Sequence, residues 1–182
     1  MNIYVIAGPP GIGKSTYSRE LVPANIPIID QDLAAYQYKK KGFEDYQDIA
    51  TIATNQRIKQ YLFDKESFAL ELNLGFESHY AYLKSIASFD WSNKITVLLF
   101  FTDSVELCLD RAQVRHQSGG HEVKADIIKE MYANTFSLFE RNRSLFHEVR
   151  LVNVTYDSVT ELAKNSKPLP QWVSDNKLEA YL

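Results

Sequence analysis

The feature that most constrains this chain is an eight-residue pattern near its start. Residues 8–15 read GPPGIGKS, which matches G-x-x-x-x-G-K-[ST], between an apolar run at 3–7 and a helical pattern at 14–22. Glycines here let the backbone turn tightly and point successive N–H groups inward, and such a turn at the start of a helix binds phosphate. In its required strand–loop–helix context the full pattern is specific. The sequence therefore predicts a nucleotide-binding phosphate loop.

The residues that follow the last glycine of this loop have separate expected tasks. Lys14 is expected to reach the β- and γ-phosphates of ATP, and the Ser15 hydroxyl to coordinate Mg²⁺. The prolines stiffen the first half of the loop. The residues predicted to bind the nucleotide are Gly8, Pro9, Pro10, Gly11, Ile12, Gly13, Lys14, Ser15 and Thr16.

The rest of the chain alternates between strand and helix patterns. Nearly continuous apolar, β-rich runs lie at 3–7, 26–30, 67–72, 94–101 and 148–154, and helical patterns lie at 14–22, 45–64, 77–87, 104–117, 124–143 and 156–164. Strands that are apolar throughout are covered on both faces, so the pattern predicts an α/β fold with a mainly parallel sheet. We expect a P-loop NTPase of the nucleotide-kinase-like type: a three-layer sandwich around a five-stranded sheet, with a small helical lid.

The length of the chain sets the expected domain organisation. With 182 residues, the chain is long enough for one domain with a small lid. We predict a kinase domain over 1–165 with its lid at about 111–123, and a tail over 166–182 that packs on the domain through Trp172.

Composition indicates which partners and compartments to expect. The chain is 45% hydrophobic and 24% charged, with a formal net charge of −3, so it lacks the basic footprint of a nucleic-acid-binding protein. Its one cysteine, Cys108, can build neither a disulfide framework nor a thiolate metal site, and this favours a reducing cytoplasm. No export signal or membrane span is visible in the sequence, so no membrane partner is expected.

Two carboxylates at the end of the second apolar run are candidates for catalysis. Asp30 and Asp32 lie two residues apart, so in an extended chain they would point to the same side. A carboxylate beside the phosphate loop can accept the proton of an attacking hydroxyl, and we predict this role for Asp32. Asp30 is expected to orient the loop or to support the metal. The alternative is that one carboxylate caps the helix that follows.

A third strand should end at the same edge. Glu71 closes the run 67–72, and burying a carboxylate there without a partner would be costly, so Glu71 is a candidate for Mg²⁺–water contact or for holding the substrate hydroxyl. Asn73 could contribute substrate hydrogen bonds. The alternative is an ordinary strand-to-helix loop with Gly75 as its turn residue.

The segment RAQVRHQSGGHEV predicts a lid. Arg111 and Arg115 are spaced i, i+4 and share a helix face, and Ser118, Gly119 and Gly120 can form a hinge. Two guanidinium groups closing over the phosphates would neutralise the charge of the transferred group. The alternative is a solvated surface helix. The four histidines have no ligand spacing with Cys or paired carboxylates, so protein-bound zinc is not expected.

Taken together, the segments IAGPPGIGKST, IIDQDLAAY, ESFALELNLG and RAQVRHQSGGHEV resemble the zeta-toxin-like family of P-loop proteins, which includes UDP-N-acetylglucosamine kinases. The resemblance runs in order over about residues 1–158. It implies ATP- and Mg²⁺-dependent phosphorylation of a sugar-nucleotide hydroxyl. The family's phosphate-loop, catalytic, glutamate and lid positions fall on Lys14, Ser15, Asp32, Glu71, Arg111 and Arg115.

The chain also departs from the family pattern. Where members typically show Thr residues after the strand-three Glu, this chain has Leu72, Asn73 and Leu74, and Lys124 stands where a proline is common. These changes leave the phosphate acceptor open. The alternatives are a kinase for another small acceptor, such as a nucleoside or a sugar, and an ATP-binding regulatory protein with slow turnover. An antitoxin-like protein partner would fit the resemblance, but no residue indicates one.

Overall fold

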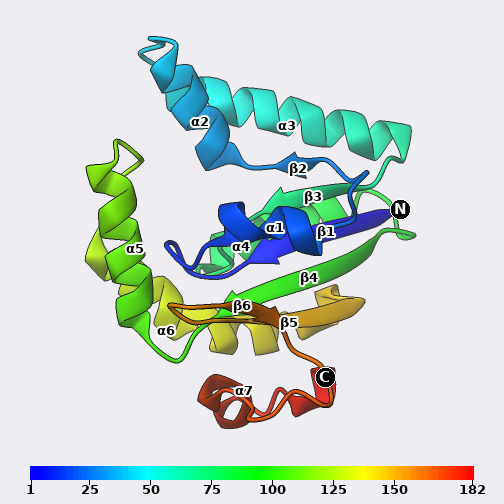
Figure 1. Cartoon of the computed structure of the whole chain (residues 1–182). Helices are drawn as coiled ribbons and strands as arrows, with labels where there is room; N and C mark the ends of the chain where they lie inside the picture. The colour runs from blue at the N-terminus through cyan, green and yellow to red at the C-terminus, as the bar shows by residue number, and fades with distance from the viewer.

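A six-stranded sheet in the order β2-β3-β1-β4-β5-β6 forms the centre of the computed structural model, which describes residues 1–182 (Figure 1). The first five strands are parallel, and β6 runs antiparallel to β5. The strands are β1 (Asn2–Ala7), β2 (Ile28–Ile29), β3 (Phe68–Glu71), β4 (Lys94–Phe101), β5 (Glu148–Val154) and β6 (Val159–Glu161). The α/β fold with a mainly parallel sheet is therefore confirmed.

Seven α-helices connect or follow these strands. They are α1 (Lys14–Leu21), α2 (Gln31–Lys40), α3 (Tyr46–Asp64), α4 (Glu77–Ala87), α5 (Val105–Gln117), α6 (Ala125–Arg141) and α7 (Gln171–Asp175), with short 3₁₀ turns at Arg143–Leu145 and Glu179–Tyr181. None of them combines the length and the apolar character that a bilayer-crossing helix needs.

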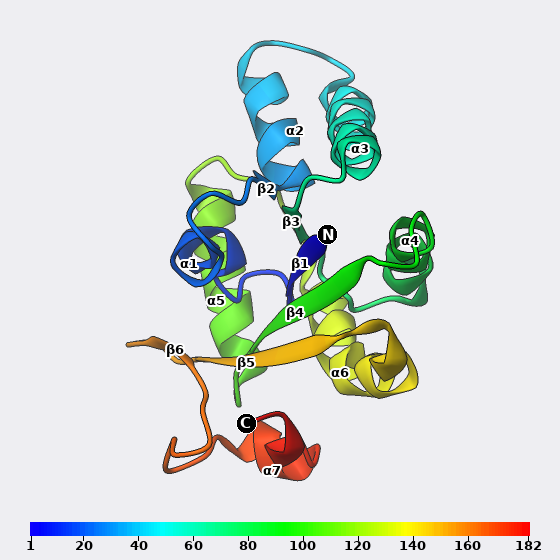
Figure 2. The same ribbon diagram turned by 90° about the vertical axis from the view of Figure 1, so that its right-hand side faces the viewer.

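The helices form one layer on each face of the sheet. Figure 2 shows α1 and α5 on one side and α3, α4 and α6 on the other. The side chains of β4 alternate between the two faces of the sheet. Val97 and Leu99 point into the core under α3, α4 and α6. Leu98 and Phe100 point into the core under α1 and α5. Because both faces are buried, the strand is apolar at almost every position. The three-layer sandwich is confirmed.

The strand order changes direction at β1. This strand pairs with β3 on one side and with β4 on the other. Strands β2 and β3 therefore extend the sheet on one side of β1, and β4, β5 and β6 extend it on the other. Ligands of open α/β sheets bind outside the carboxyl ends of the strands at such a switch point. The loop 8–13 follows β1 directly and so lies at this position.

The helix predicted at 156–164 is wrong, and so is the five-strand count. Thr155 and Ser158 form a turn, with the Thr155 N–H donating to the Ser158 carbonyl at 2.9 Å, and the chain returns as β6 beside β5. Across the two strands, Arg150 forms a bidentate ion pair with Glu161. This pair and the β-branched residues of β6 outweigh the local helical pattern, because strand pairing depends on partners distant in sequence.

The C-terminal segment packs against the core that contains α6. Trp172 is 3% exposed and stacks on Phe136, with ring centroids 5.7 Å apart. Its indole N–H donates to Asn153 at 2.9 Å, and its backbone N–H donates to the Asp103 carboxylate at 2.8 Å. Apolar area and hydrogen bonds thus both hold α7 in place.

We predict that Trp172→Ala lowers the free energy of unfolding by about 3–5 kcal/mol, because it empties a packed aromatic site. The chain offers a matched control in its other tryptophan, since Trp91 is 96% exposed. Trp91→Ala is expected to change the same quantity by less than about 0.5 kcal/mol. Urea unfolding followed by circular dichroism measures both, and equal effects would contradict the packing described for α7.

Candidate active site

The loop between β1 and α1 is held by close backbone approach. Gly8 has φ +138°, and a Cβ there would overlap the Phe100 carbonyl oxygen; Gly11 has φ +83°, and a Cβ there would overlap the Cys108 carbonyl oxygen. Both positions therefore require glycine, for conformation and for space. The loop lies directly against the end of β4 and the first turns of α5.

Four backbone N–H groups of this loop are unpaired within the protein. Those of Gly11, Gly13, Lys14 and Ser15 donate to no atom of the chain. They stand at the N-terminus of α1, where the helix dipole favours negative charge. Unpaired N–H groups at a helix start form an anion site, so this loop can hold phosphate oxygens.

Lys14 is buried at the base of this loop, with 4% of its surface exposed. Its ammonium donates to the carbonyl oxygens of Gly8 at 2.9 Å and Pro9 at 3.1 Å, and lies 3.9 Å from Glu71. Burial lowers the pKa of Lys14, and the negative charge of Glu71 opposes this shift. The ammonium thus has partners on one side and open cavity on the other.

Glu71 ends β3 and faces the loop from the neighbouring strand. Burial raises its pKa to about 7, and the charge of Lys14 opposes that shift without cancelling it. The Ser15 hydroxyl donates to Glu71 at 2.9 Å. Two residues predicted to contact the nucleotide and its metal are thus tied to one carboxylate.

The two aspartates after β2 have different environments. Asp30 is the N-cap of α2 and accepts a hydrogen bond from the Leu33 N–H at 2.9 Å, which is the capping alternative raised by the sequence. Asp32 makes no side-chain hydrogen bond and lines the cavity above the phosphate loop. Of the two, Asp32 has the carboxylate that is free to meet a ligand.

The two arginines predicted in the lid also differ. Arg111 donates to the Ile12 carbonyl of the phosphate loop at 3.2 Å and to the Thr155 carbonyl at 3.0 Å. Arg115 is exposed, and its one hydrogen bond, to the His121 carbonyl, is long at 3.5 Å. Arg111 joins the phosphate loop to the turn after β5, whereas Arg115 has its guanidinium largely free.

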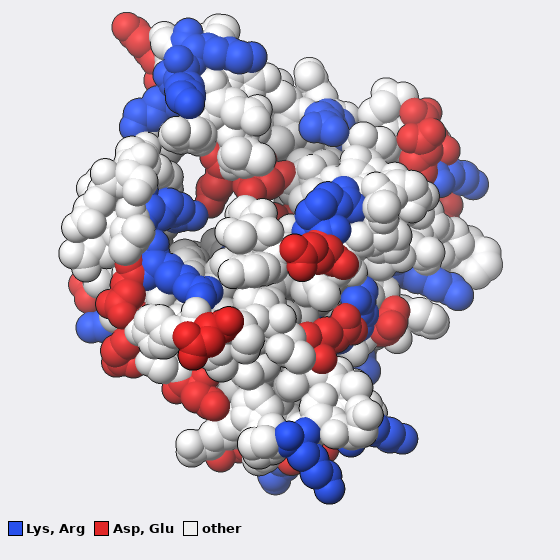
Figure 3. Space-filling view, viewed as in Figure 1, with Lys and Arg blue, Asp and Glu red and all other residues white.

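These residues surround one cavity of about 550 Å³. On the face seen in Figure 3, the molecule is hollowed beside the α5 arm, with acidic and basic side chains both at the margin. Of the residues predicted from the sequence, those lining the cavity are Pro10, Gly11, Gly13, Lys14, Ser15, Thr16, Asp32, Glu71, Asn73, Arg111 and Arg115. The structure thus brings together predicted residues from four separate segments.

Sequence reasoning missed one wall of this cavity. Tyr17, Asp110, Val114 and Tyr156 also line it, and the Tyr156 hydroxyl donates to Asp110 at 2.7 Å. Tyr156 was included in the helix predicted at 156–164, which concealed its position. Its place follows from the turn after β5, and no local pattern marked that turn.

The site fits a nucleoside triphosphate with Mg²⁺. The unpaired N–H groups and Lys14 suit phosphate oxygens, and the Ser15 hydroxyl and the nearby carboxylates are the oxygen ligands that Mg²⁺ prefers. No cluster of three or more His, Cys, Asp or Glu side chains could hold an ion alone. Mg²⁺ in such sites binds through one or two protein oxygens together with the phosphates of the substrate.

Comparison with solved structures identifies proteins of similar fold. A protein from Chloroflexus aurantiacus assigned as a kinase superimposes with a TM-score of 0.62 at 14% identity, over 100% of this chain and 98% of its own. The chain has the P-loop kinase fold. A chain of the PezAT chromosomal toxin–antitoxin system of Streptococcus pneumoniae gives the same score and identity, over 99% of this chain and 85% of its own.

A third similar structure is from the AvrRxo1-ORF1:AvrRxo1-ORF2 complex, with a TM-score of 0.62 at 14% identity. The match covers 89% of this chain and 57% of that one, so this protein spans little more than half the length of that relative. No family model and no curated protein sequence matches the chain. At these identities, the similarity is one of fold, and the fold implied by the zeta-toxin-like resemblance is confirmed.

The raised pKa of Glu71 predicts a pH dependence of stability. Native Glu71 keeps its proton up to about pH 7, whereas the unfolded side chain releases it near 4.5. The native state then binds more protons between these values, so the free energy of unfolding falls as the pH rises through them. Relative to Glu71→Gln, the wild type should lose up to about 3 kcal/mol between pH 5 and pH 8.

Urea unfolding at several pH values measures this difference. Glu66→Gln, at an exposed position five residues earlier, serves as the control and should give a difference that does not change with pH. If the difference in the free energy of unfolding between wild type and Glu71→Gln also stays constant with pH, the buried environment described for Glu71 is contradicted.

Replacement of the two arginines predicted in the lid should change the free energy of unfolding by different amounts. Arg111→Ala is expected to lower the free energy of unfolding by about 1–3 kcal/mol, because it removes the donor to two backbone carbonyls. Arg115→Ala is expected to change it by less than about 0.5 kcal/mol, as for other exposed positions. Thermal and urea unfolding of the nucleotide-free protein test this; a larger loss in Arg115→Ala would reverse the assignment.

Proposed function

We propose that the protein is an ATP-dependent kinase that transfers the γ-phosphate to a hydroxyl group of a small molecule. The observation that carries this proposal is the position of Asp32. Its carboxylate lines the phosphate cavity together with Lys14 and Ser15, and it also lines a second cavity of about 270 Å³ between α2, α3 and the lid loop. A carboxylate that lines both cavities is placed to accept the proton of an acceptor hydroxyl that attacks the γ-phosphate of ATP.

On the donor side, the chain supplies positive charge and directed N–H groups. The four unpaired N–H groups of the loop would bind the β- and γ-phosphates, and Lys14 would turn from the Gly8 and Pro9 carbonyls toward them. Arg115, whose guanidinium is largely free, would neutralise charge on the transferred group. Arg111 would act indirectly, by holding the loop through the Ile12 carbonyl.

The metal would complete this arrangement. Bound Mg²⁺ would neutralise phosphate charge and orient the γ-phosphate. Ser15 is the residue that would hold it, after its hydroxyl leaves Glu71, which could then contact a metal-bound water. Because Glu71 has a pKa of about 7, it can release its proton near neutral pH and take up that role.

On the acceptor side, Asp32 would take the proton of the attacking hydroxyl. It lies in the first turn of α2 and lines both cavities. Asn73, which also lines the phosphate cavity, would orient the hydroxyl through a hydrogen bond. Most of the rate acceleration would come from positioning and from charge neutralisation.

The identity of the acceptor stays a prediction. The zeta-toxin-like resemblance implies UDP-N-acetylglucosamine, and a nucleoside or a free sugar are the alternatives within the same activity. An antitoxin-like partner also stays a proposal, which the presence of PezAT among the similar structures supports. Co-expression with the product of an adjacent gene, followed by co-purification, would test it.

A second candidate function is an ATP-binding regulatory protein with slow turnover. The hydrogen bonds of Ser15 to Glu71 and of Lys14 to the loop carbonyls favour this candidate, because nucleotide binding would have to exchange them and so could change the conformation of the site. A kinase transfers labelled phosphate to an acceptor, whereas a regulatory protein binds ATP without doing so.

We predict that Asp32→Asn lowers kcat by about 10²–10⁴-fold, because an amide cannot accept the proton. Asp30→Asn is the matched control, since asparagine caps helices as well as aspartate does, and should stay within a few-fold of the wild type. Transfer of label from γ-labelled ATP with Mg²⁺ measures both. An equal loss in Asp30→Asn would instead support a metal-directed role for Asp30.

The first assay offers UDP-N-acetylglucosamine beside nucleosides, sugars and sugar phosphates, with Lys14→Ala as the blank. Label on one of these compounds, absent with Lys14→Ala, supports the kinase. Label on none of them, with ATP still bound, favours the regulatory candidate and counts against the proposal.

A further inference from the structure

The second cavity beside Asp32 indicates what kind of acceptor the protein takes; this inference rests on the proposed kinase function. We call this cavity the acceptor chamber. Its lining residues are Gln31, Asp32, Ala35, Tyr36, Lys39, Tyr46, Gln47, Asp48, Thr51, Gly119 and His121. A hydroxyl between Asp32 and the γ-phosphate leaves the rest of the acceptor in this chamber, so the lining should match its chemistry.

The charges of the chamber are unfavourable for a phosphorylated acceptor. Two carboxylates, Asp32 and Asp48, face a single ammonium, that of Lys39. This ammonium lies 5.6 Å from the centroid of the Tyr46 ring and is already engaged in a cation–π contact. A neighbouring space that shares Asp32 with the chamber adds one carboxylate, Asp30, and one guanidinium, Arg115, so it leaves the excess of negative charge unchanged. An anionic group placed in the chamber would meet like charges.

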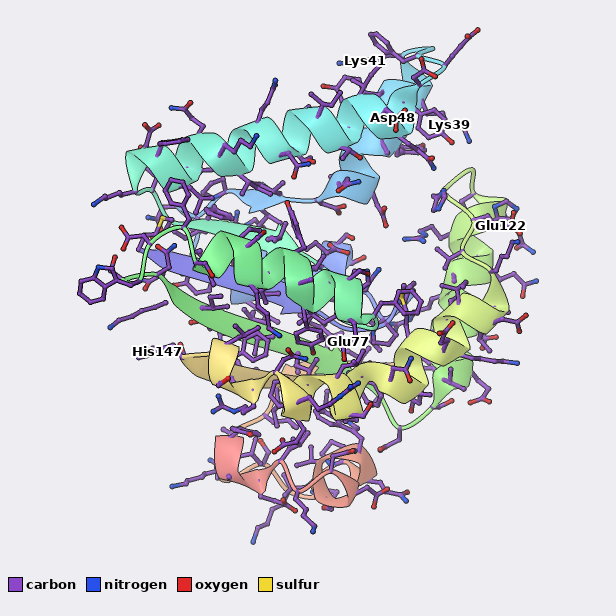
Figure 4. All side chains as sticks on the ribbon, turned by 180° about the vertical axis from the view of Figure 1, so that it is seen from behind. Lys39, Lys41, Asp48, Glu77, Glu122 and His147 are labelled. Carbon is purple, nitrogen blue, oxygen red and sulfur yellow. The ribbon has the colours of Figure 1, made fainter.

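Three of the cations around Asp32 lie on the nucleotide side. Lys14, Arg111 and Arg115 line the phosphate cavity, and none of them lines the chamber. Figure 4 shows Lys39 and Asp48 on adjacent helices, across the opening from the lid loop that carries another acidic residue, Glu122. The phosphate cavity balances three cations against three carboxylates, whereas the acceptor chamber has two carboxylates and one ammonium, so only the chamber is net acidic.

The remaining groups of the chamber suit hydroxyls. Gln31 donates its amide N–H to the Thr51 hydroxyl at 2.8 Å, and Thr51 in turn donates to the Gln47 carbonyl at 2.9 Å, so the chain of polar groups between α2 and α3 is already ordered. Carboxylates and amides can bond neighbouring hydroxyls in pairs. Two tyrosines, Tyr36 and Tyr46, add flat rings against which a sugar ring can pack.

From this lining, we propose that the acceptor is a sugar or an amino sugar without phosphate groups. A neutral sugar would bond its hydroxyls to the carboxylates and amides of the chamber. The ammonium of an amino sugar would in addition pair with Asp48. The acceptor hydroxyl oxygen forms the new bond to the γ-phosphorus, its proton passes to Asp32, and the bond to the leaving ADP oxygen breaks.

The test uses four compounds with the same sugar ring and different charge: glucosamine, N-acetylglucosamine, N-acetylglucosamine-1-phosphate and UDP-N-acetylglucosamine. We expect kcat/KM for the two compounds without phosphate to exceed that for the two with phosphate by at least about tenfold, the size of one unfavourable charge contact at a partly exposed site. A tenfold preference for either phosphorylated compound, while label is transferred, overturns the proposal and leaves the kinase function standing.

Charge-changing variants on α3 sharpen this test. Asp48→Lys should raise kcat/KM for N-acetylglucosamine-1-phosphate relative to N-acetylglucosamine by at least about tenfold. Asp64→Lys makes the same charge change on the same helix, outside the chamber, and should leave the ratio within about twofold. Asp48→Asn is the milder variant if the lysine does not fold, and should shift the ratio in the same direction. An unchanged ratio in a folded Asp48 variant overturns the proposal.

A binding measurement separates this inference from the proposed function. Calorimetric titration of the four compounds into the protein with ADP and Mg²⁺ requires no transfer of phosphate. If the compounds without phosphate bind more tightly than those with phosphate, but the transfer assay yields no labelled product, the kinase function is refuted and the chamber assignment is supported. Binding of none of the four compounds at 10 mM, or binding in the reverse order, overturns the assignment.

Discussion

The ammonium of Lys14 is held at the carboxyl edge of the sheet by two backbone carbonyls and by the carboxylate of Glu71. A buried charge without such partners would destabilise the fold, so the positions of the loop, of β1 and of β3 are all linked to this one group. Burial lowers the pKa of Lys14 and raises that of Glu71, so in both side chains it favours the uncharged form. A phosphate that binds Lys14 would therefore have to replace partners that the folded protein already provides.

The helix α5 packs against the phosphate loop that surrounds this buried pair. Its Cys108 carbonyl lies so close to Gly11 that no side chain fits between them, and its Arg111 donates to the Ile12 carbonyl. One turn further on, Arg115 is exposed, and beyond it the lid loop contributes Gly119 and His121 to the acceptor chamber. The helix thus supports the phosphate loop and lines one cavity, and the loop that follows the helix lines the other.

Prediction from the sequence succeeded where a local pattern carries a physical requirement. The loop at 8–15, the five parallel strands and most helices follow from glycine spacing and from apolar runs that must be covered on both faces. It failed at 156–164, where β6 forms because Arg150 and Glu161 pair across strands. The separate tasks of Asp30 and Asp32, and of Arg111 and Arg115, could not be read from spacing, because both members of each pair satisfy the same local pattern.

The sequence by itself determined that a glycine-rich turn joins a buried strand to a helix near the start of the chain, because glycine spacing after an apolar run is a local signal. It also determined that carboxylates follow the neighbouring strands of a mainly parallel sheet. Only the tertiary structure decided that Asp32 lines two cavities, and that Asp48 of α3 lines one of them while Lys14 and the two arginines of α5 line the other. The physical reason is that electrostatics and hydrogen bonding act through space, between segments that the chain order leaves far apart.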